Sequence, residues 1–137
     1  MSDYEKKVSG AARFIQSRLH VSPEIAIITG TGLGEIAGLL KNADKIAYGE
    51  IPHFPVSTVE SHAGQLFWGT LGKKPVFILQ GRFHLYEGYS PLEVAFPIRV
   101  LQMLKVKTLI ISNAAGGLNL GYTPGDIMVI RDHINLT

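Results

Sequence analysis

Three short apolar runs, each ending in a loop of small or polar residues, constrain the fold of this chain most. The runs are residues 25–28 (IAII), 75–80 (PVFILQ) and 108–112 (TLIIS). Continuous apolar runs of this length are typical of strands that are covered on both faces of a sheet. The segments that follow them are residues 30–34 (GTGLG), 81–86 (GRFHLY) and 113–117 (NAAGG). The sequence therefore predicts a sheet with its candidate functional residues in the loops that follow these strands.

The remaining pattern alternates helices with strands. Residues 2–20 repeat apolar side chains at helical spacing, and Ser2 with Glu5 fits a capping box. A second helix is predicted to begin at Ser90, which is followed by proline and, two positions later, glutamate. Shorter elements are expected as a helix start at residues 36–40, an edge strand at 45–48, a hairpin of 65–70 with 75–80, a turn at 122–126 and a final strand at 127–130. This order is that of an α/β fold.

Length and composition indicate a single globular domain over residues 1–137. Hydrophobic residues make up 46% of the chain and charged residues 18%, which is not the composition of a disordered protein. The formal net charge of +2 argues against nucleic acid as a partner. Residues 1–7 (MSDYEKK) lack the apolar core of a signal peptide, and no apolar run reaches the roughly 18 residues of a membrane span. We therefore expect a soluble cytoplasmic protein without a membrane partner.

Segment 81–86 places polar side chains at every second position. If the backbone stays extended past Gly81, then Arg82, His84 and Tyr86 point to one side, while Phe83 and Leu85 anchor the segment from the other. A guanidinium group beside an imidazole suits an oxyanion, because both groups donate hydrogen bonds. The alternative is a polar strand end that faces water.

The glycine-rich segment 30–34 also favours an anion. It joins a predicted strand to a predicted helix, so unpaired backbone N–H groups would point at the turn. Glu35 stands where a dinucleotide-binding fingerprint needs glycine, and no lysine follows as a P-loop requires. A phosphate-sized cradle that contains the Thr31 hydroxyl remains, and a tight structural turn is the alternative.

The three strand-end segments would converge on one anion if their strands are neighbours with the same direction. Phosphate is the anion that this arrangement favours. Segment 113–117 could instead be small because it packs closely against another element. The five histidines show no paired ligand spacing for a metal, and the chain has neither cysteine nor a Gly-x-Ser-x-Gly motif for a nucleophile.

The chain resembles the trimeric type of purine nucleoside phosphorylase over nearly its whole length from residue 25. The matching motifs are residues 30–34, 51–59, 62–64, 81–89, 113–119 and 125–135. The resemblance implies a mixed, largely parallel central sheet flanked by helices. It also implies phosphorolysis of 6-oxopurine ribonucleosides and deoxyribonucleosides in purine salvage, by a homotrimer that uses inorganic phosphate as co-substrate and needs no cofactor or metal.

The resemblance also assigns roles to single residues. The phosphate-binding residues would be Thr31, His62, Arg82, His84 and Ala114, the last through its backbone N–H. Tyr86 would contact the ribose. Asn113, Ala115 and Gly116 would form the wall towards the base.

Departures from the family pattern leave alternatives open. Thr31 stands where serine is frequent, and Ser61 where glycine is common. Members of the family are about twice as long, so the chain is expected to be the N-terminal half, without the residues that recognise the purine. A catalytically silent anion-binding fragment and a methylthioadenosine phosphorylase are the alternative functions, and a dinucleotide-binding module ranks behind them.

Overall fold

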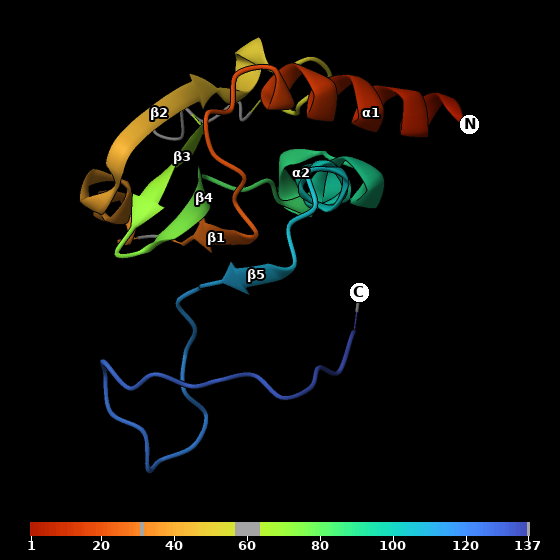
Figure 1. Cartoon of the computed structure of the whole chain (residues 1–137). Coiled ribbons are helices and arrows are strands. Elements are labelled where there is room, and N and C mark those ends of the chain that lie inside the picture. The colour runs from red at the N-terminus through yellow and green to blue at the C-terminus, as the bar shows by residue number, and fades with distance from the viewer. Residues whose placement is uncertain (31, 57–63, 137) are drawn as a thin grey trace.

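A single mixed sheet forms the centre of the computed structural model, which describes residues 1–30, 32–56 and 64–136 (Figure 1). Its strands within the described residues are β1 (Ile25–Thr29), β2 (Lys41–Ala47), β3 (Gln65–Leu71), β4 (Lys74–Gln80) and β5 (Thr108–Ile111), in the order β2-β3-β4-β1-β5. β1 is parallel to β4 and β5, and β3 is antiparallel to β2 and β4. Only β3 among these strands therefore runs opposite to the others, so the expectation of a mixed, largely parallel sheet is confirmed.

Two α-helices, α1 (Asp3–Gln16) and α2 (Pro91–Met103), cover one face of the sheet (Figure 1). Both begin at the predicted capping boxes, because Ser2 and Ser90 each accept a bond from the backbone N–H of the glutamate three residues on. α1 ends at Gln16, four residues before the predicted end, where the Arg18 N–H turns to the Ile15 carbonyl at 2.9 Å. No helix in the described residues is long and apolar enough to cross a membrane.

The other face of the sheet is covered by a short 3-10 helix, η1 (Gly34–Leu39). Ala37 of η1 packs against Val76 and Ile78 of β4. The expected helix start at residues 36–40 is therefore corrected to this single short element. The physical reason is that Leu40 adopts an extended conformation and β2 begins at the next residue, which leaves no length for an α-helix.

Segment 81–86 does not stay extended, contrary to the prediction. Gly81 turns the chain with φ of 105°, and a further 3-10 turn, η3 (Leu85–Glu87), follows. Phe83 is buried as predicted, but Leu85 is 49% exposed and does not anchor the segment. The alternation fails because a 3-10 turn rotates successive side chains by about a third of a turn instead of a half.

Residues 113–136 form no helix or strand, so the predicted strand at 127–130 is wrong. The predicted turn is present, since the Asp126 N–H donates to the Thr123 carbonyl at 3.1 Å. Figure 1 shows this blue segment leaving β5 and running apart from the sheet. Ile127 and Val129 are 95% and 89% exposed. A strand needs a neighbour to pair its backbone groups, and the described residues place none beside this run.

Candidate anion-binding site

The candidate site lies at the edge of the sheet where three neighbouring parallel strands end. The register pairs Thr29 of β1 with Gln80 of β4, and Ile28 of β1 with Ile111 of β5. The carboxyl ends of β4, β1 and β5 therefore lie side by side. The predicted convergence of the three segments is confirmed at the level of the backbone.

Gly30 is the point at which the three segments touch. A Cβ atom at this position would lie 2.8 Å from Nη2 of Arg82, 2.8 Å from the carbonyl oxygen of Ser112 and 3.3 Å from Cα of Asn113. No larger residue can occupy position 30 without moving one of these groups. The glycine therefore lets the Arg82 guanidinium approach the backbone of the glycine-rich segment.

Ser112 holds this arrangement from β5. Its Oγ accepts a hydrogen bond from the Gly30 N–H at 3.1 Å and donates to the Ile28 carbonyl at 3.4 Å. In the sequence, Ser112 stands out only as the end of an apolar run. A hydroxyl residue at the end of such a run, next to a glycine-rich segment, is the only signal that could have identified it.

Arg82 is half-buried and supplies the positive charge of the site. In the part of the chain that the structure describes, no carboxylate lies within ion-pairing distance of it. An arginine without a carboxylate partner can offer its planar set of donors to a bound anion.

His84 is oriented by Glu87. Nδ1 of His84 lies 2.7 Å from Oε1 of Glu87, and the same oxygen accepts the His84 backbone N–H at 3.0 Å. The Glu87 side chain is only 6% exposed. This geometry assigns a proton to Nδ1, so Nε2 is the nitrogen that can contact a ligand. Sequence reasoning missed Glu87, although its spacing of three residues from His84 in a turn was a usable signal.

Tyr86 lies against His84 on the outside of the molecule. The two rings are stacked, with centroids 4.6 Å apart and planes at 17°, and Tyr86 is 83% exposed. Asn113, Ala114, Ala115 and Gly116 follow β5 and are exposed. Thr31 and His62 lie outside the described residues. The structure thus brings Arg82 and Asn113 together at Gly30 and places Tyr86 on His84.

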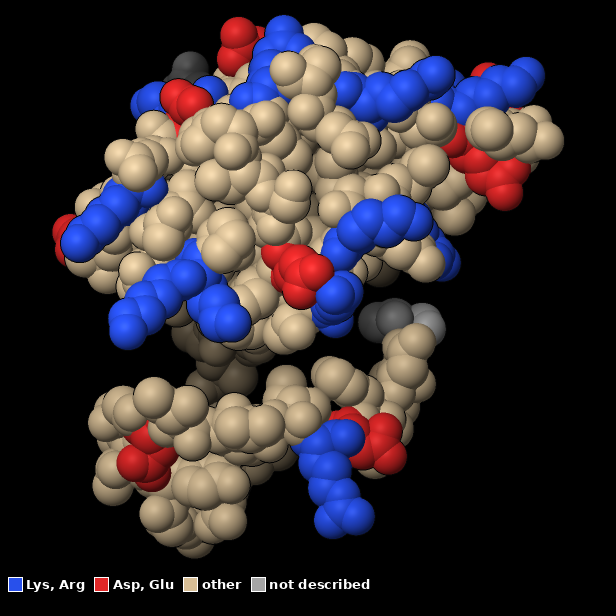
Figure 2. All heavy atoms as spheres, viewed as in Figure 1, with Lys and Arg blue, Asp and Glu red and all other residues tan. Residues whose placement is uncertain are grey.

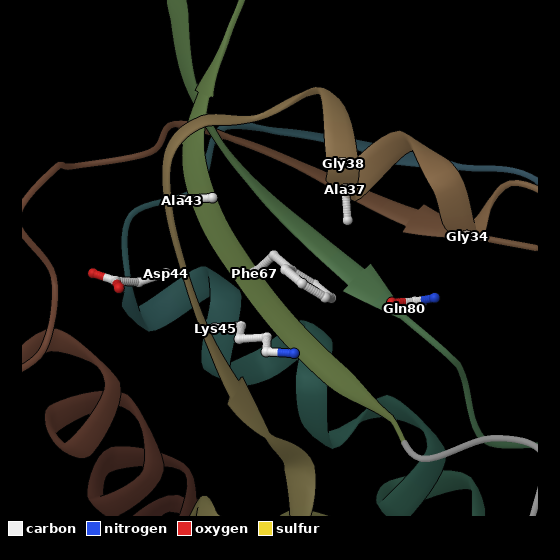
Figure 3. A pocket seen from close by; sticks show the side chains of 8 residues that line it. All are labelled: Gly34, Ala37, Gly38, Ala43, Asp44, Lys45, Phe67 and Gln80. Atoms are coloured by element: carbon white, nitrogen blue, oxygen red, sulfur yellow. The ribbon is translucent and has the colours of Figure 1, made fainter.

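A cavity of about 490 Å³ lies apart from these residues, between η1 and the outer strands (Figure 3). Figure 3 shows Phe67 in its wall, with Lys45 and Asp44 of β2 along one side. Gly34 of the glycine-rich segment lines it, but none of the predicted ligand-binding residues that the structure describes does. Among the described residues, no group of three or more histidine, aspartate or glutamate side chains could hold a metal ion.

The charges of the molecule do not gather around one surface in the view of Figure 2. Lysine and arginine side chains are dispersed over this face and interspersed with acidic ones. On this face, anion binding would therefore depend on local contacts rather than on a broad positive field.

Comparisons with known proteins identify what the chain resembles. The family described as "Phosphorylase superfamily" matches residues 24–137. Purine nucleoside phosphorylase 1 of Geobacillus stearothermophilus is 52% identical over 128 residues, which are 93% of this chain and 47% of that protein. Purine nucleoside phosphorylase of Mus musculus is 49% identical over 134 residues, or 98% of this chain and 45% of that protein.

Solved structures that resemble this chain are also purine nucleoside phosphorylases. Schistosoma mansoni purine nucleoside phosphorylase in complex with adenosine superposes with a TM-score of 0.82 at 48% identity, over 88% of this chain and 42% of that one. A purine nucleoside phosphorylase in complex with ribose-1-phosphate gives a TM-score of 0.83 at 50% identity, over 88% and 44%. The chain spans less than half the length of each of these relatives.

Proposed function

The chain belongs to the phosphorylase superfamily, and we propose on this premise that it carries the phosphate site of a purine nucleoside phosphorylase. The observation that supports this most is the meeting of Arg82, Ser112 and Asn113 at Gly30, at the shared edge of three parallel strands. Among the described residues Arg82 has no carboxylate partner, and an arginine of this kind beside glycine backbone suits an oxyanion of the size of phosphate.

In the proposed reaction a phosphate oxygen attacks C1′ of the nucleoside. The bond between C1′ and the base nitrogen breaks, the base leaves with the electron pair, and ribose 1-phosphate forms. The transition state resembles an oxocarbenium ion, so the anion beside it must be held in place, and no protein nucleophile is needed.

The proposed phosphate ligands act from several segments. Arg82 supplies two donors to phosphate oxygens, and His84 as an imidazolium donates from Nε2–H while Glu87 accepts from its Nδ1–H. The backbone N–H of Ala114 adds a further donor. Thr31 and His62 complete the set by resemblance alone.

Residues next to the proposed phosphate ligands would contact the ribose and the base. Tyr86 stacks on His84, so a ribose in contact with Tyr86 would lie next to the phosphate. Asn113, Ala115 and Gly116 would form the wall towards the base. The preference for 6-oxopurines, assembly as a homotrimer, a cytoplasmic location and a role in purine salvage belong to the same proposal and rest on the family resemblance.

A second candidate is that the 137-residue chain alone binds phosphate without turnover. The observation in its favour is that relatives of this family are more than twice as long as the region they share with this chain. The two candidates differ in one measurement. Release of hypoxanthine from inosine and phosphate by the chain excludes the silent fragment, whereas phosphate binding without release supports it.

Titration calorimetry with inorganic phosphate tests the site itself. Arg82→Gln should weaken phosphate binding by about tenfold or more, which corresponds to about 1.4 kcal/mol. Arg99→Gln makes the same change on α2, where the Arg99 side chain donates to Gln102, and should leave binding unchanged. Equal affinity of wild type and Arg82→Gln would refute the proposed site. Release of adenine from methylthioadenosine, with none of hypoxanthine from inosine, would assign the chain to the other branch of the family.

A further inference from the structure

Tyr48 connects two segments that lie far from it in the chain. It begins the 3-10 turn η2 (Tyr48–Glu50) after the edge strand β2, and only 2% of its surface is exposed. Its hydroxyl donates a hydrogen bond to the Gly81 carbonyl at 2.9 Å, and its backbone N–H donates to the Gly64 carbonyl at 2.9 Å. One buried residue thus donates hydrogen bonds to the residue before β3 and to the residue after β4.

Two glycines make room for this contact. A Cβ atom at Gly64 would lie 2.1 Å from Cδ2 of Tyr48, so the tyrosine ring packs directly on the glycine backbone. Gly81 has φ of 105°, a conformation that favours glycine, and a Cβ there would lie 3.4 Å from Cα of Gly64. The three residues are therefore packed against one another without intervening side chains.

The contacts of Tyr48 lie on both sides of Arg82. Gly81, before Arg82, has its carbonyl bound by the Tyr48 hydroxyl. Phe83, after Arg82, is 5% exposed and has its ring centroid 5.5 Å from that of Tyr48. Because both neighbours of Arg82 are held by the same side chain, the backbone that carries the guanidinium has little freedom to rotate.

We propose that Tyr48 is a positioning residue for the candidate anion site. Through its contacts with Gly81 and Phe83, Tyr48 holds Arg82 in place. Tyr48 does not contact the anion. That the anion is phosphate rests on the proposed function. The positioning of Arg82 by Tyr48 rests only on the contacts of Tyr48.

The protonation state of Tyr48 fits this role. Burial raises the pKa of the phenol above its ordinary value, so the hydroxyl remains a hydrogen-bond donor at neutral and moderately alkaline pH. The Gly81 carbonyl is therefore bound throughout the range in which the chain would be assayed.

The variant Tyr48→Phe tests the proposal, with Tyr4→Phe as a matched control. The Tyr4 hydroxyl also donates to a main-chain carbonyl, that of Leu92 at 3.0 Å, and its ring also packs on a phenylalanine, Phe96. Each variant loses one tyrosine hydrogen bond, so both should lower the thermal midpoint. Only Tyr48→Phe should raise the dissociation constant of inorganic phosphate, by about fivefold to tenfold, measured well below the thermal midpoint.

A second readout needs no ligand. The backbone amide shifts and hydrogen exchange of residues 81–84 are compared between wild type and Tyr48→Phe without phosphate, and we expect altered shifts and faster exchange in the variant. Unchanged shifts and exchange would overturn the positioning role, whatever the chain binds. Failure of wild type to bind phosphate would instead remove the proposed function, and altered shifts would still support the role of Tyr48.

Discussion

At the scale of single residues, the missing side chains of two glycines allow the close contacts of the candidate site. Gly30 allows the Arg82 guanidinium to approach the glycine-rich segment, and Gly64 allows the Tyr48 ring to pack on the backbone. A methyl group at either position would collide with a neighbour. The candidate site therefore depends on two absent side chains.

His53 is a residue whose backbone conformation costs stability. Its φ is 64°, in the left-handed region, where asparagine is tolerated better than histidine because its short side chain bonds the local backbone. His53→Asn should raise the free energy of unfolding by about 0.5–1 kcal/mol, seen as a higher thermal midpoint by calorimetry. His133→Asn is the matched control at an exposed position without positive φ, and an equal gain there would contradict the explanation.

At the scale of elements, the two α-helices begin where their sequences indicate. Ser2 with Glu5 and Ser90 with Glu93 each form a reciprocal capping box. This signal is local, since it needs only residues within one turn. By contrast, η1 is cut short where β2 begins, and local preference does not show this.

The start of α2 should make stability depend on pH. Hydrogen bonds from the Ser90 hydroxyl and backbone N–H lower the pKa of Glu93 below its ordinary value. The carboxylate is favoured in the folded state, so its contribution is fully present above the unfolded-state pKa. That contribution is lost as the pH falls through the lower folded-state pKa.

Glu93→Gln should therefore lower the thermal midpoint at neutral pH and have a smaller effect in acid. The measurement is the difference in midpoint between wild type and variant across an acid-to-neutral series. Glu24→Gln is the control, because Glu24 pairs with Lys107 and is not part of a cap. A difference that does not vary with pH would argue against the cap as its source.

At the scale of the whole molecule, the central sheet contrasts with the last described residues, 113–136. The centre of the sheet is packed, and Phe77 and Ile78 of β4 are fully buried. Residues 113–136 carry many exposed apolar side chains and run apart from the sheet (Figure 1). Local stability should differ accordingly along the chain.

Hydrogen exchange should reveal this contrast directly. The amides of Ile27 and Ile78 bond within the central strands and should exchange slowly. The amides of Ile127 and Val129 have no ladder partner in the described residues and should exchange at rates close to those of an unfolded peptide. Slow exchange at residues 127–130 would show that they do pair as a strand, as their sequence predicted.

The sequence by itself determined the features that depend on near neighbours. Apolar runs identified β1, β4 and β5, capping residues located α1 and α2, and the small or charged residues after three strands indicated an anion site. These signals are readable because strand burial and helix capping leave patterns over a few positions. The ligand-binding roles that the resemblance gave to single residues all stay predictions, namely those of Thr31, His62, Arg82, His84, Tyr86, Asn113, Ala114, Ala115 and Gly116.

Only the tertiary structure decided which of those residues meet. The contact of Gly30 with Arg82 and Ser112, and the bond from Tyr48 to Gly81, join residues that are distant in the chain. Such contacts depend on strand order and register, which no local pattern encodes. The same reason explains why Leu85 was wrongly placed and why residues 127–130 were predicted as a strand: side-chain burial and strand pairing both require a partner, and the chain's three-dimensional path decides whether that partner is present.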